Sequence, residues 1–250
     1  MLCRTQRGFR SVPEGALNRR RNASGLILLA LAAAAVAACN RGIPVPPRTH
    51  PDVSAWTDLF APDLSNAEAP AGVWSFEHGV LTATEDQNIW TKDSYADCIV
   101  DIEFKTDTGT NSGIIVYCSD TGDWIPNSVE IQIADDFSET WASSPATWRC
   151  GAVFGHLAPF KSAVKKPGEW NRATITCKGP NVWVMLNGES VTALDMTRWT
   201  SAKTNPDGSE IPPWLSKPLA ELPTKGRIGL QGKHAGAPIY FRNLKVLRLD

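Results

Sequence analysis

Apolar and polar residues alternate strictly along two segments of the chain. In residues 129–133, Val, Ile and Ile alternate with Glu130 and Gln132, and the apolar residues 98, 100, 102 and 104 lie opposite Asp101, Glu103 and Lys105. Because successive side chains of a strand point to opposite faces, both segments are predicted as strands with one core face. The polar faces are either solvated or line a cleft for a polar ligand.

Similar short runs, separated by turn residues, predict strands through most of the chain. They lie at residues 74–77, 80–83, 88–91, 98–105, 113–118, 129–134, 173–178, 182–186, 227–231 and 239–249. Asn187–Gly188 has the composition of a tight hairpin turn. No helical periodicity of useful length follows the N-terminal region, so residues 55–250 are predicted as one all-β domain, an antiparallel two-sheet sandwich.

The N-terminal region has the pattern of an export signal. Arg19–Arg21 precede an apolar run from Gly25 to Ala38, which ends in small residues before Cys39. This pattern resembles a bacterial lipobox and predicts a lipoprotein signal in residues 1–38, lipid on Cys39 and a Pro-rich tether in residues 39–54. The alternative is an ordinary signal peptide with a chance cysteine. Asn40 is not the retention residue Asp, so we expect a periplasmic or cell-surface protein, anchored to the outer membrane by lipid.

Charge and cysteine content limit the partners and the compartment. The formal net charge is −1 and no long basic run follows the signal, which argues against nucleic acid as a partner. Membrane contact is expected only through the lipid anchor. In an oxidising compartment the four cysteines of the domain allow three pairings, and buried free thiols are the alternative; these are Cys98, Cys118, Cys150 and Cys177.

Two long segments without strand patterns are rich in bulky aromatic residues. Residues 135–166 contain Trp141, Trp148, Phe154 and His156, and residues 196–225 contain five prolines with two further tryptophans. Long loops of this kind in a compact domain are usually functional or disordered, and the aromatic residues favour ordered packing. We therefore expect these two loops to form the wall of a cleft.

An ordered set of short segments resembles the 3-keto-disaccharide hydrolase domain family. It comprises residues 56–60, 90–92, 101–105, 111–114, 129–133, 168–171, 226–234 and 241–243, nearly the whole mature chain. The resemblance implies a concanavalin-like jelly roll that acts on 3-keto-glycosides and 3-keto-disaccharides, with a sugar 3-dehydrogenase acting upstream. One position departs from the family pattern, because Tyr117 stands where an arginine is common.

A carbonyl at carbon 3 of a sugar acidifies the proton on carbon 2. Its removal gives an enolate, and the group on carbon 1 can then leave by elimination, or overall hydrolysis if water adds back. The site needs a base near carbon 2 and donors or a cation near the enolate oxygen. Glu130 is expected to be the base, with Glu103 beside it on a neighbouring strand, Gln132 as a hydrogen-bonding group and His234 as the imidazole.

Other residues are weaker candidates for substrate binding. Lys92, Lys105 and Lys233 could supply a cation, and Tyr117 occupies the position of the missing arginine. Asn111, Asp135, His156 and Trp183 could contact a sugar from strand ends, loops or a strand face. No cofactor is expected, although Asp135 or Asp136 could hold a divalent cation.

Two alternatives to this enzyme remain open. The same sandwich could be a non-catalytic, lectin-like carbohydrate-binding module that uses its tryptophans as a platform. It could also be an ordinary glycoside hydrolase with two close carboxylates, although residues 129–133 offer only one acid.

Overall fold

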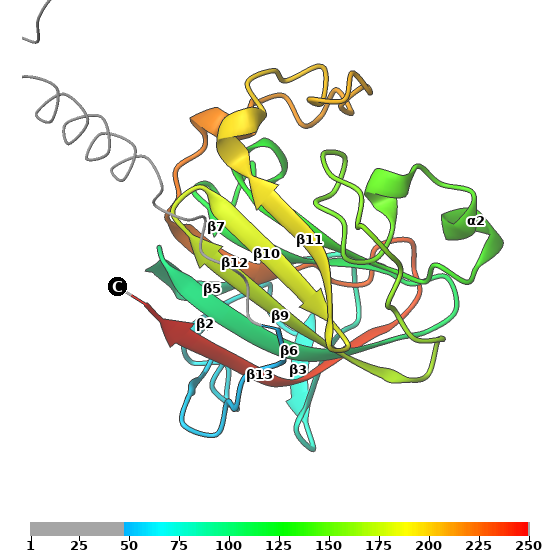
Figure 1. Cartoon of the computed structure of the whole chain (residues 1–250). Helices are drawn as coiled ribbons and strands as arrows, with labels where there is room; N and C mark the ends of the chain where they lie inside the picture. The colour runs from blue at the N-terminus through cyan, green and yellow to red at the C-terminus, as the bar shows by residue number, and fades with distance from the viewer. Residues whose placement is uncertain (1–47, 250) are drawn as a thin grey trace, which may run out of the picture. The chain divides into compact units, whose positions relative to one another are not determined.

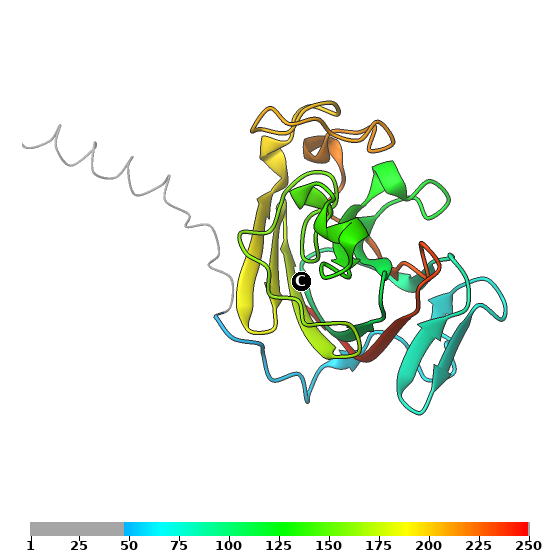
Figure 2. The same cartoon turned by 90° about the vertical axis from the view of Figure 1, so that its right-hand side faces the viewer.

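The computed structural model describes residues 48–249, and the predicted signal, Cys39 and most of the tether lie outside this range. Two antiparallel sheets pack face to face (Figures 1 and 2), which confirms the predicted two-sheet sandwich. None of the helices in residues 48–249 has the length and apolar character needed to cross a membrane.

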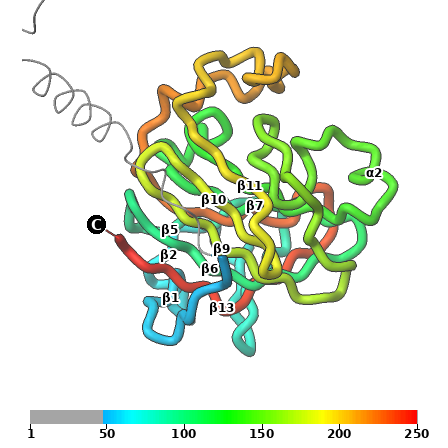
Figure 3. Tube along the Cα trace, viewed as in Figure 1, coloured from blue at the N-terminus to red at the C-terminus, as the bar shows by residue number. Residues whose placement is uncertain are grey.

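The larger sheet has eight strands in the order β11-β10-β9-β6-β13-β4-β3, with β1 also paired to β13. Its strands are β1 (Thr57–Asp58), β3 (Trp74–Glu77), β4 (Val80–Ala83), β6 (Cys98–Thr106), β9 (Trp170–Lys178), β10 (Asn181–Leu186), β11 (Glu189–Asp195) and β13 (Ile239–Arg248). Figure 3 shows the described N-terminal segment, in blue, running beside this sheet before β1.

The smaller sheet has five strands in the order β2-β5-β12-β7-β8. They are β2 (Ala67–Glu68), β5 (Ile89–Tyr95), β7 (Asn111–Cys118), β8 (Val129–Ala134) and β12 (Gly226–Leu230). Short helices occupy the loops: η1 (Ile125–Asn127), α2 (Glu139–Ala142), η2 (Ala146–Trp148), η3 (Met196–Arg198) and η4 (Leu219–Glu221).

The alternating residues of β6 and β8 form part of the core between the sheets. Val100, Ile102 and Phe104 of β6 are buried there with Ile131 and Ile133 of β8. The predicted core faces of both strands are therefore confirmed. Burial of such side chains contributes about 1.5–3 kcal/mol each, so these positions fix the register of each strand.

All four cysteines of the domain are buried free thiols. Cys98 of β6 lies directly opposite Cys177 of β9 in the antiparallel register. Burial raises the pKa of Cys118 to about 11 and also raises the pKa of Cys150. Of the two alternatives for these cysteines, the structure has buried free thiols and not disulfides.

Candidate functional site

The face of the smaller sheet that points away from the core carries a cavity of about 370 Å³, called here the aromatic chamber. Five aromatic side chains line it: Trp124, Trp141, Trp148, Phe154 and Trp214. The polar side chains in its lining are Asn111, Glu130, Gln132, Gln231 and His234. Aromatic walls with a few converging polar groups are typical of a small-molecule site.

A second cavity of about 740 Å³, called here the polar trench, adjoins the chamber. Its polar lining side chains include Glu68, Asp86, Gln87, Asn88 and Thr121. Trp124, Ile125, Gln231 and His234 line both cavities. The two cavities therefore form one cleft with a shared wall.

Two loops supply most of the aromatic wall. Figure 2 shows residues 135–166, in green, close to residues 196–225, which run from yellow to orange. The ring centroid of Trp148 lies 5.3 Å from that of Phe154 and 6.3 Å from that of Trp214. Trp141 donates from Nε1 to the carbonyl of Gly109 at 3.2 Å. The prediction that these loops wall a cleft is confirmed.

Glu130 projects from the start of β8 into the chamber across Gly113 of β7. A Cβ at Gly113 would lie 2.2 Å from Oε1 of Glu130, so only glycine leaves room for this carboxyl. Within residues 48–249 the carboxyl has no hydrogen-bond or ion-pair partner, and its burial raises the pKa of Glu130 from 4.5 to about 8. Glu130 is therefore mostly neutral at pH 7.

The amide groups of the chamber are held in fixed positions. Gln132 donates from Nε2 to Oδ1 of Asn111 at 2.9 Å, and both side chains are buried. Asn111 also pairs through its backbone with His234, which brings the loop after β12 against the start of β7. Asn111, Gln132 and His234 therefore share the lining of the chamber with Glu130.

His234 is paired with Asp86 at the wall shared by the two cavities. Its Nδ1 lies 2.7 Å from Oδ2 of Asp86, and both side chains are about half exposed. A carboxylate on Nδ1 fixes the tautomer that carries its hydrogen there, so Nε2 keeps a free lone pair. The pair combines an oriented imidazole with access to solvent.

A domain family described as "3-keto-alpha-glucoside-1,2-lyase-like domain" matches residues 52–247. The chain belongs to this family. A crystal structure of a candidate glycosyl hydrolase from Parabacteroides distasonis ATCC 8503 is 56% identical, with a TM-score of 0.76 over 78% of this chain and 99% of that chain. A second one from the same organism is 22% identical, with a TM-score of 0.62 over 75% and 90% of the chains, and shows the shared fold. No curated protein matches the chain.

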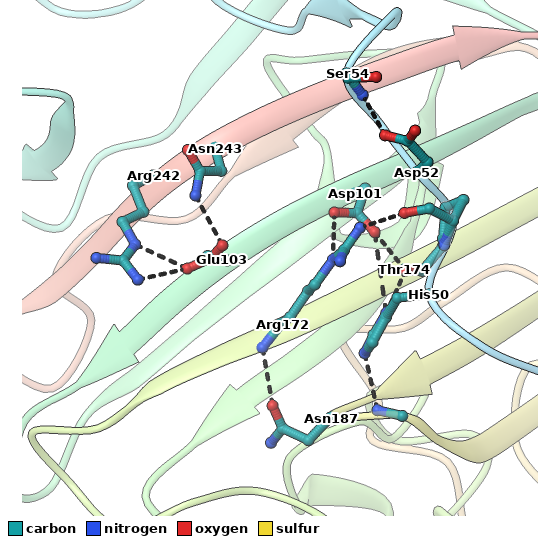
Figure 4. Close-up of polar contacts among 12 residues, drawn as sticks. His50, Asp52, Ser54, Asp101, Glu103, Arg172, Thr174, Asn187, Arg242 and Asn243 are labelled. Atoms are coloured by element: carbon teal, nitrogen blue, oxygen red, sulfur yellow. Dashed lines mark hydrogen bonds and ion pairs between the residues drawn. The ribbon is translucent and has the colours of Figure 1, made fainter.

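Glu103 does not join Glu130 in this member of the lyase-like family, and the expectation that the two meet on neighbouring strands is wrong. β6 and β8 belong to different sheets. On the face of the larger sheet away from the core, Glu103 accepts hydrogen bonds from Arg242 at 2.8 Å and Asn243 at 2.7 Å (Figure 4). The alternation of β6 placed Glu103 on a polar face but could not show which sheet it joined.

The expected cations also lie outside the chamber. Lys105 packs over the rings of Trp170 and Tyr240, at 5.3 and 4.7 Å from their centroids, on the same face as Glu103. Lys92 donates from Nζ to the carbonyl of Ser65 at 2.7 Å. Lys233 follows the chamber residue Gln231 but is absent from the lining of both cavities.

Two expected sugar contacts are buried structural residues instead. Tyr117 is buried in the core and donates to the carbonyl of Gly179 at 2.9 Å; burial raises the pKa of its phenol. Trp183 points away from the apolar face of β10 as expected, but it is only 4% exposed and cannot stack on a ligand without rearrangement.

Asp135 and His156 occupy other positions in the loops. Asp135 is buried and accepts from the backbone N–H groups of Gly109 and Phe137 at 2.9 and 3.1 Å. His156 lines a separate cavity of about 500 Å³ with Arg198 and Trp199. Within residues 48–249 no group of three or more His, Cys, Asp and Glu side chains is placed to hold a metal ion.

Sequence reasoning missed several residues of the cleft. Asp86 lies in the loop between β4 and β5, and no local pattern marks it as the partner of His234. Trp124 lies in a loop without a recognisable motif, although it belongs to the wall shared by both cavities. Gln231 lies within the family-like segment 226–234, which was the signal that could have identified it.

Proposed function

We propose that this cleft cleaves glycosides whose sugar carries a carbonyl at carbon 3, by removing the proton on carbon 2 and expelling the group on carbon 1. The supporting observation is that Glu130 and His234, two groups able to transfer protons, line one chamber with oriented amides. Such groups are what proton removal at carbon 2 and proton delivery to a leaving group require. The description of the matching family as a 3-keto-alpha-glucoside-1,2-lyase-like domain supports the same chemistry.

The chamber favours elimination over direct displacement at carbon 1. An ordinary glycoside hydrolase uses two carboxyl groups about 5–9.5 Å apart across the glycosidic bond. Among the described residues that line the chamber, Glu130 alone carries a carboxyl group, and Glu103 lies in the other sheet. Asp86 is already paired with His234. One carboxyl and one imidazole fit a proton removal and a proton delivery.

The deciding experiment is incubation with 3-keto-trehalose, 3-keto-sucrose and a 3-keto-β-glucoside, with release of the free product followed in time. Glu130→Gln should reduce turnover by about 100-fold or more, since general acid–base groups contribute about 10²–10⁴-fold. Glu103→Gln is the matched control, because Glu103 lies on the other sheet, and it should keep its activity. If wild type binds these sugars without product release, the protein is a carbohydrate-binding module.

The proposed setting is an exported lipoprotein supplied by a sugar 3-dehydrogenase. The lipid anchor rests on the sequence of residues 1–39 alone, which lie outside the described residues. The dehydrogenase is expected from the family alone. Expression of the full chain with radiolabelled fatty acid should label the wild type. It should leave Cys39→Ser unlabelled and released from the membrane fraction.

A further inference from the structure

The two halves of the cleft differ in what they offer a substrate. The polar trench presents Gln87, Asn88 and Thr121 to its ligand, beside Glu68, which is paired with Arg227. In the aromatic chamber the buried Gln132 amide is already bonded to Asn111. A sugar ring carries several hydroxyl groups, and each unpaired hydroxyl that loses water costs free energy. The trench therefore suits the sugar ring, and the chamber suits an apolar, flat group.

The size and shape of the chamber agree with this division. Its volume of about 370 Å³ can hold a group of one to two fused aromatic rings. Trp148 packs against both Phe154 and Trp214, so aromatic surfaces enclose the ligand from two loops. Trp214 is 47% exposed. A single exposed apolar side chain is common on protein surfaces, but one that joins other apolar side chains marks a binding contact. Here Trp214 forms the rim of the chamber.

The two proton-transferring groups lie in opposite environments. Glu130 lies among aromatic rings, and within residues 48–249 His234 is the only other titratable residue that lines the chamber. Burial raises the pKa of Glu130 to about 8, which keeps the carboxyl protonated at neutral pH and able to donate. Nδ1 of His234 lies 2.7 Å from Oδ2 of Asp86. The other charged residues nearby are Glu68, which lines the trench, Lys233, which precedes His234, and Glu85, whose carbonyl accepts the N–H of Lys233.

The position of His234 places it at the junction of the two halves. It lines both cavities, whereas Glu130 lines the chamber alone. A glycoside with its sugar in the trench and its leaving group in the chamber would therefore cross this wall at the scissile bond. The imidazole then faces the sugar, and the carboxyl faces the leaving group.

We infer that the preferred substrate is a 3-keto-glycoside of an aromatic alcohol, with His234 as the base at carbon 2, Asp86 as its positioning residue, and Glu130 as the acid on the leaving oxygen. The inference rests on the proposed function. The C2–H bond breaks and its proton goes to Nε2 of His234. The electron pair passes through the enolate to form the C1=C2 bond, and the C1–O bond breaks. The leaving oxygen takes the proton of Glu130, and exchange with solvent restores both groups.

The roles are tested with two measurements on each variant. The first is exchange of the carbon-2 proton in D₂O, followed by NMR, and the second is product release. His234→Ala should abolish exchange with every substrate. Glu130→Gln should retain exchange and lose release by about 100-fold for a glucosyl leaving group, but by only about 5-fold for a nitrophenyl group, which leaves without an acid. Loss of exchange in Glu130→Gln with retention in His234→Ala would reverse the roles and overturn the inference.

Asp86 is tested with two variants, because a merely structural role would not distinguish them. Asp86→Asn should slow carbon-2 exchange and lower kcat by about 10-fold or more with little change in KM, since the imidazole loses the group that orients it. Asp86→Glu restores a carboxylate and should recover part of the exchange rate. Asp93→Asn is the matched control: Asp93 pairs with Arg248 outside the cleft, and this variant should equal wild type. Unchanged exchange in Asp86→Asn would contradict the assigned role.

Substrate preference is tested with 3-keto-glucosides that carry a phenyl, naphthyl or glucosyl leaving group. Wild type should favour the aryl compounds, and Trp214→Ala should lower their kcat/KM by about 10-fold or more, a stacking loss of about 1.4 kcal/mol. Phe160→Ala, an exposed aromatic outside the chamber, serves as the control. Preference for the glucosyl compound would overturn the inferred orientation, whereas absence of release from all three compounds would refute the proposed function itself.

Discussion

Gly113 leaves the space that the side chain of Glu130 occupies: a Cβ at Gly113 would lie 2.2 Å from Oε1, 2.8 Å from Cγ and 2.9 Å from Cδ of Glu130. The two residues lie on adjacent strands of the smaller sheet, β7 and β8. The glycine is therefore part of how the chain places its carboxyl in the chamber.

Gly113→Ala should displace the Glu130 carboxyl and lower turnover by about 10-fold or more, in line with the sensitivity of catalysis to small displacements. A double-mutant cycle with Glu130→Gln separates this effect from general damage. If the alanine acts through Glu130, it should cause little further loss in the Glu130→Gln background. Independent, multiplicative losses would mean that Gly113 matters for another reason.

The strands were predictable because each apolar alternation must bury one face. The ranges Val80–Ala83 and Val129–Ala134 agree with the prediction residue for residue, and β6 extends it by one residue. The core face of β8 followed from period two alone. The placement of Glu130 and Gln132 on the other face of β8 was predictable for the same reason.

The assembly of the site was less predictable, because it depends on which strands become neighbours. Glu103 and Glu130 look equivalent in the sequence. In the structure, however, β6 lies between β9 and β13 in the larger sheet, whereas β8 is an edge strand of the smaller sheet. The partnership of Asp86 with His234 spans 148 positions and has no local pattern. Long-range pairings of this kind come from the topology and not from periodicity.

The bond between Gln132 and Asn111 should be measurable as a coupling free energy. Asn111→Ala leaves the buried Nε2 of Gln132 without its acceptor, which should cost about 1–3 kcal/mol of unfolding free energy and raise KM. In Asn111→Ala/Gln132→Leu the unpaired amide is gone, so the double variant should be no less stable than Asn111→Ala. Urea unfolding of the wild type, Asn111→Ala, Gln132→Leu and the double variant checks this. Strictly additive losses of unfolding free energy would exclude the coupling.

His156 should make the protein less stable in mild acid. Its side chain is buried, and burial lowers the pKa of His156 from 6.5 to about 4. A lowered pKa means that the folded state binds fewer protons than the unfolded state. The contribution of the neutral His156 to the free energy of unfolding is therefore complete above pH 6.5. It is lost as the pH falls from 6.5 to 4, by about 3 kcal/mol in total.

The matched variant for this test is His156→Asn, whose amide can still donate to the carbonyl of Phe154 as Nδ1 does at 2.9 Å. Unfolding free energies of both proteins at pH 7.5, 5.5 and 4.5 give the difference directly, because all other groups cancel. The wild type should lose more stability than the variant on acidification. Parallel pH curves would show that His156 does not contribute.

A second pH-dependent contact holds the N-terminal segment against the larger sheet. His50 bonds Oγ1 of Thr174 through Nδ1 at 2.7 Å, and its Nε2 accepts the N–H of Gly188 at 2.8 Å (Figure 4). Thr174 in turn donates to Asp101, which pairs with Arg172. This arrangement requires the neutral imidazole with its hydrogen on Nδ1, because a proton on Nε2 would face the Gly188 N–H.

Acid should therefore release the contact at Gly188 before the domain unfolds. Burial lowers the pKa of His50, and the positive charge of Arg172 lowers it further. The negative charge of Asp101 opposes this shift only in part. The contact is complete above pH 6.5 and is lost as the pH falls below that value. Hydrogen exchange of the Gly188 amide should accelerate over this range. The neighbouring Asn187 amide, which donates to the carbonyl of Arg172 at 2.9 Å, should stay protected. Equal acceleration of both amides would mean that the whole hairpin opens and that His50 is not the cause.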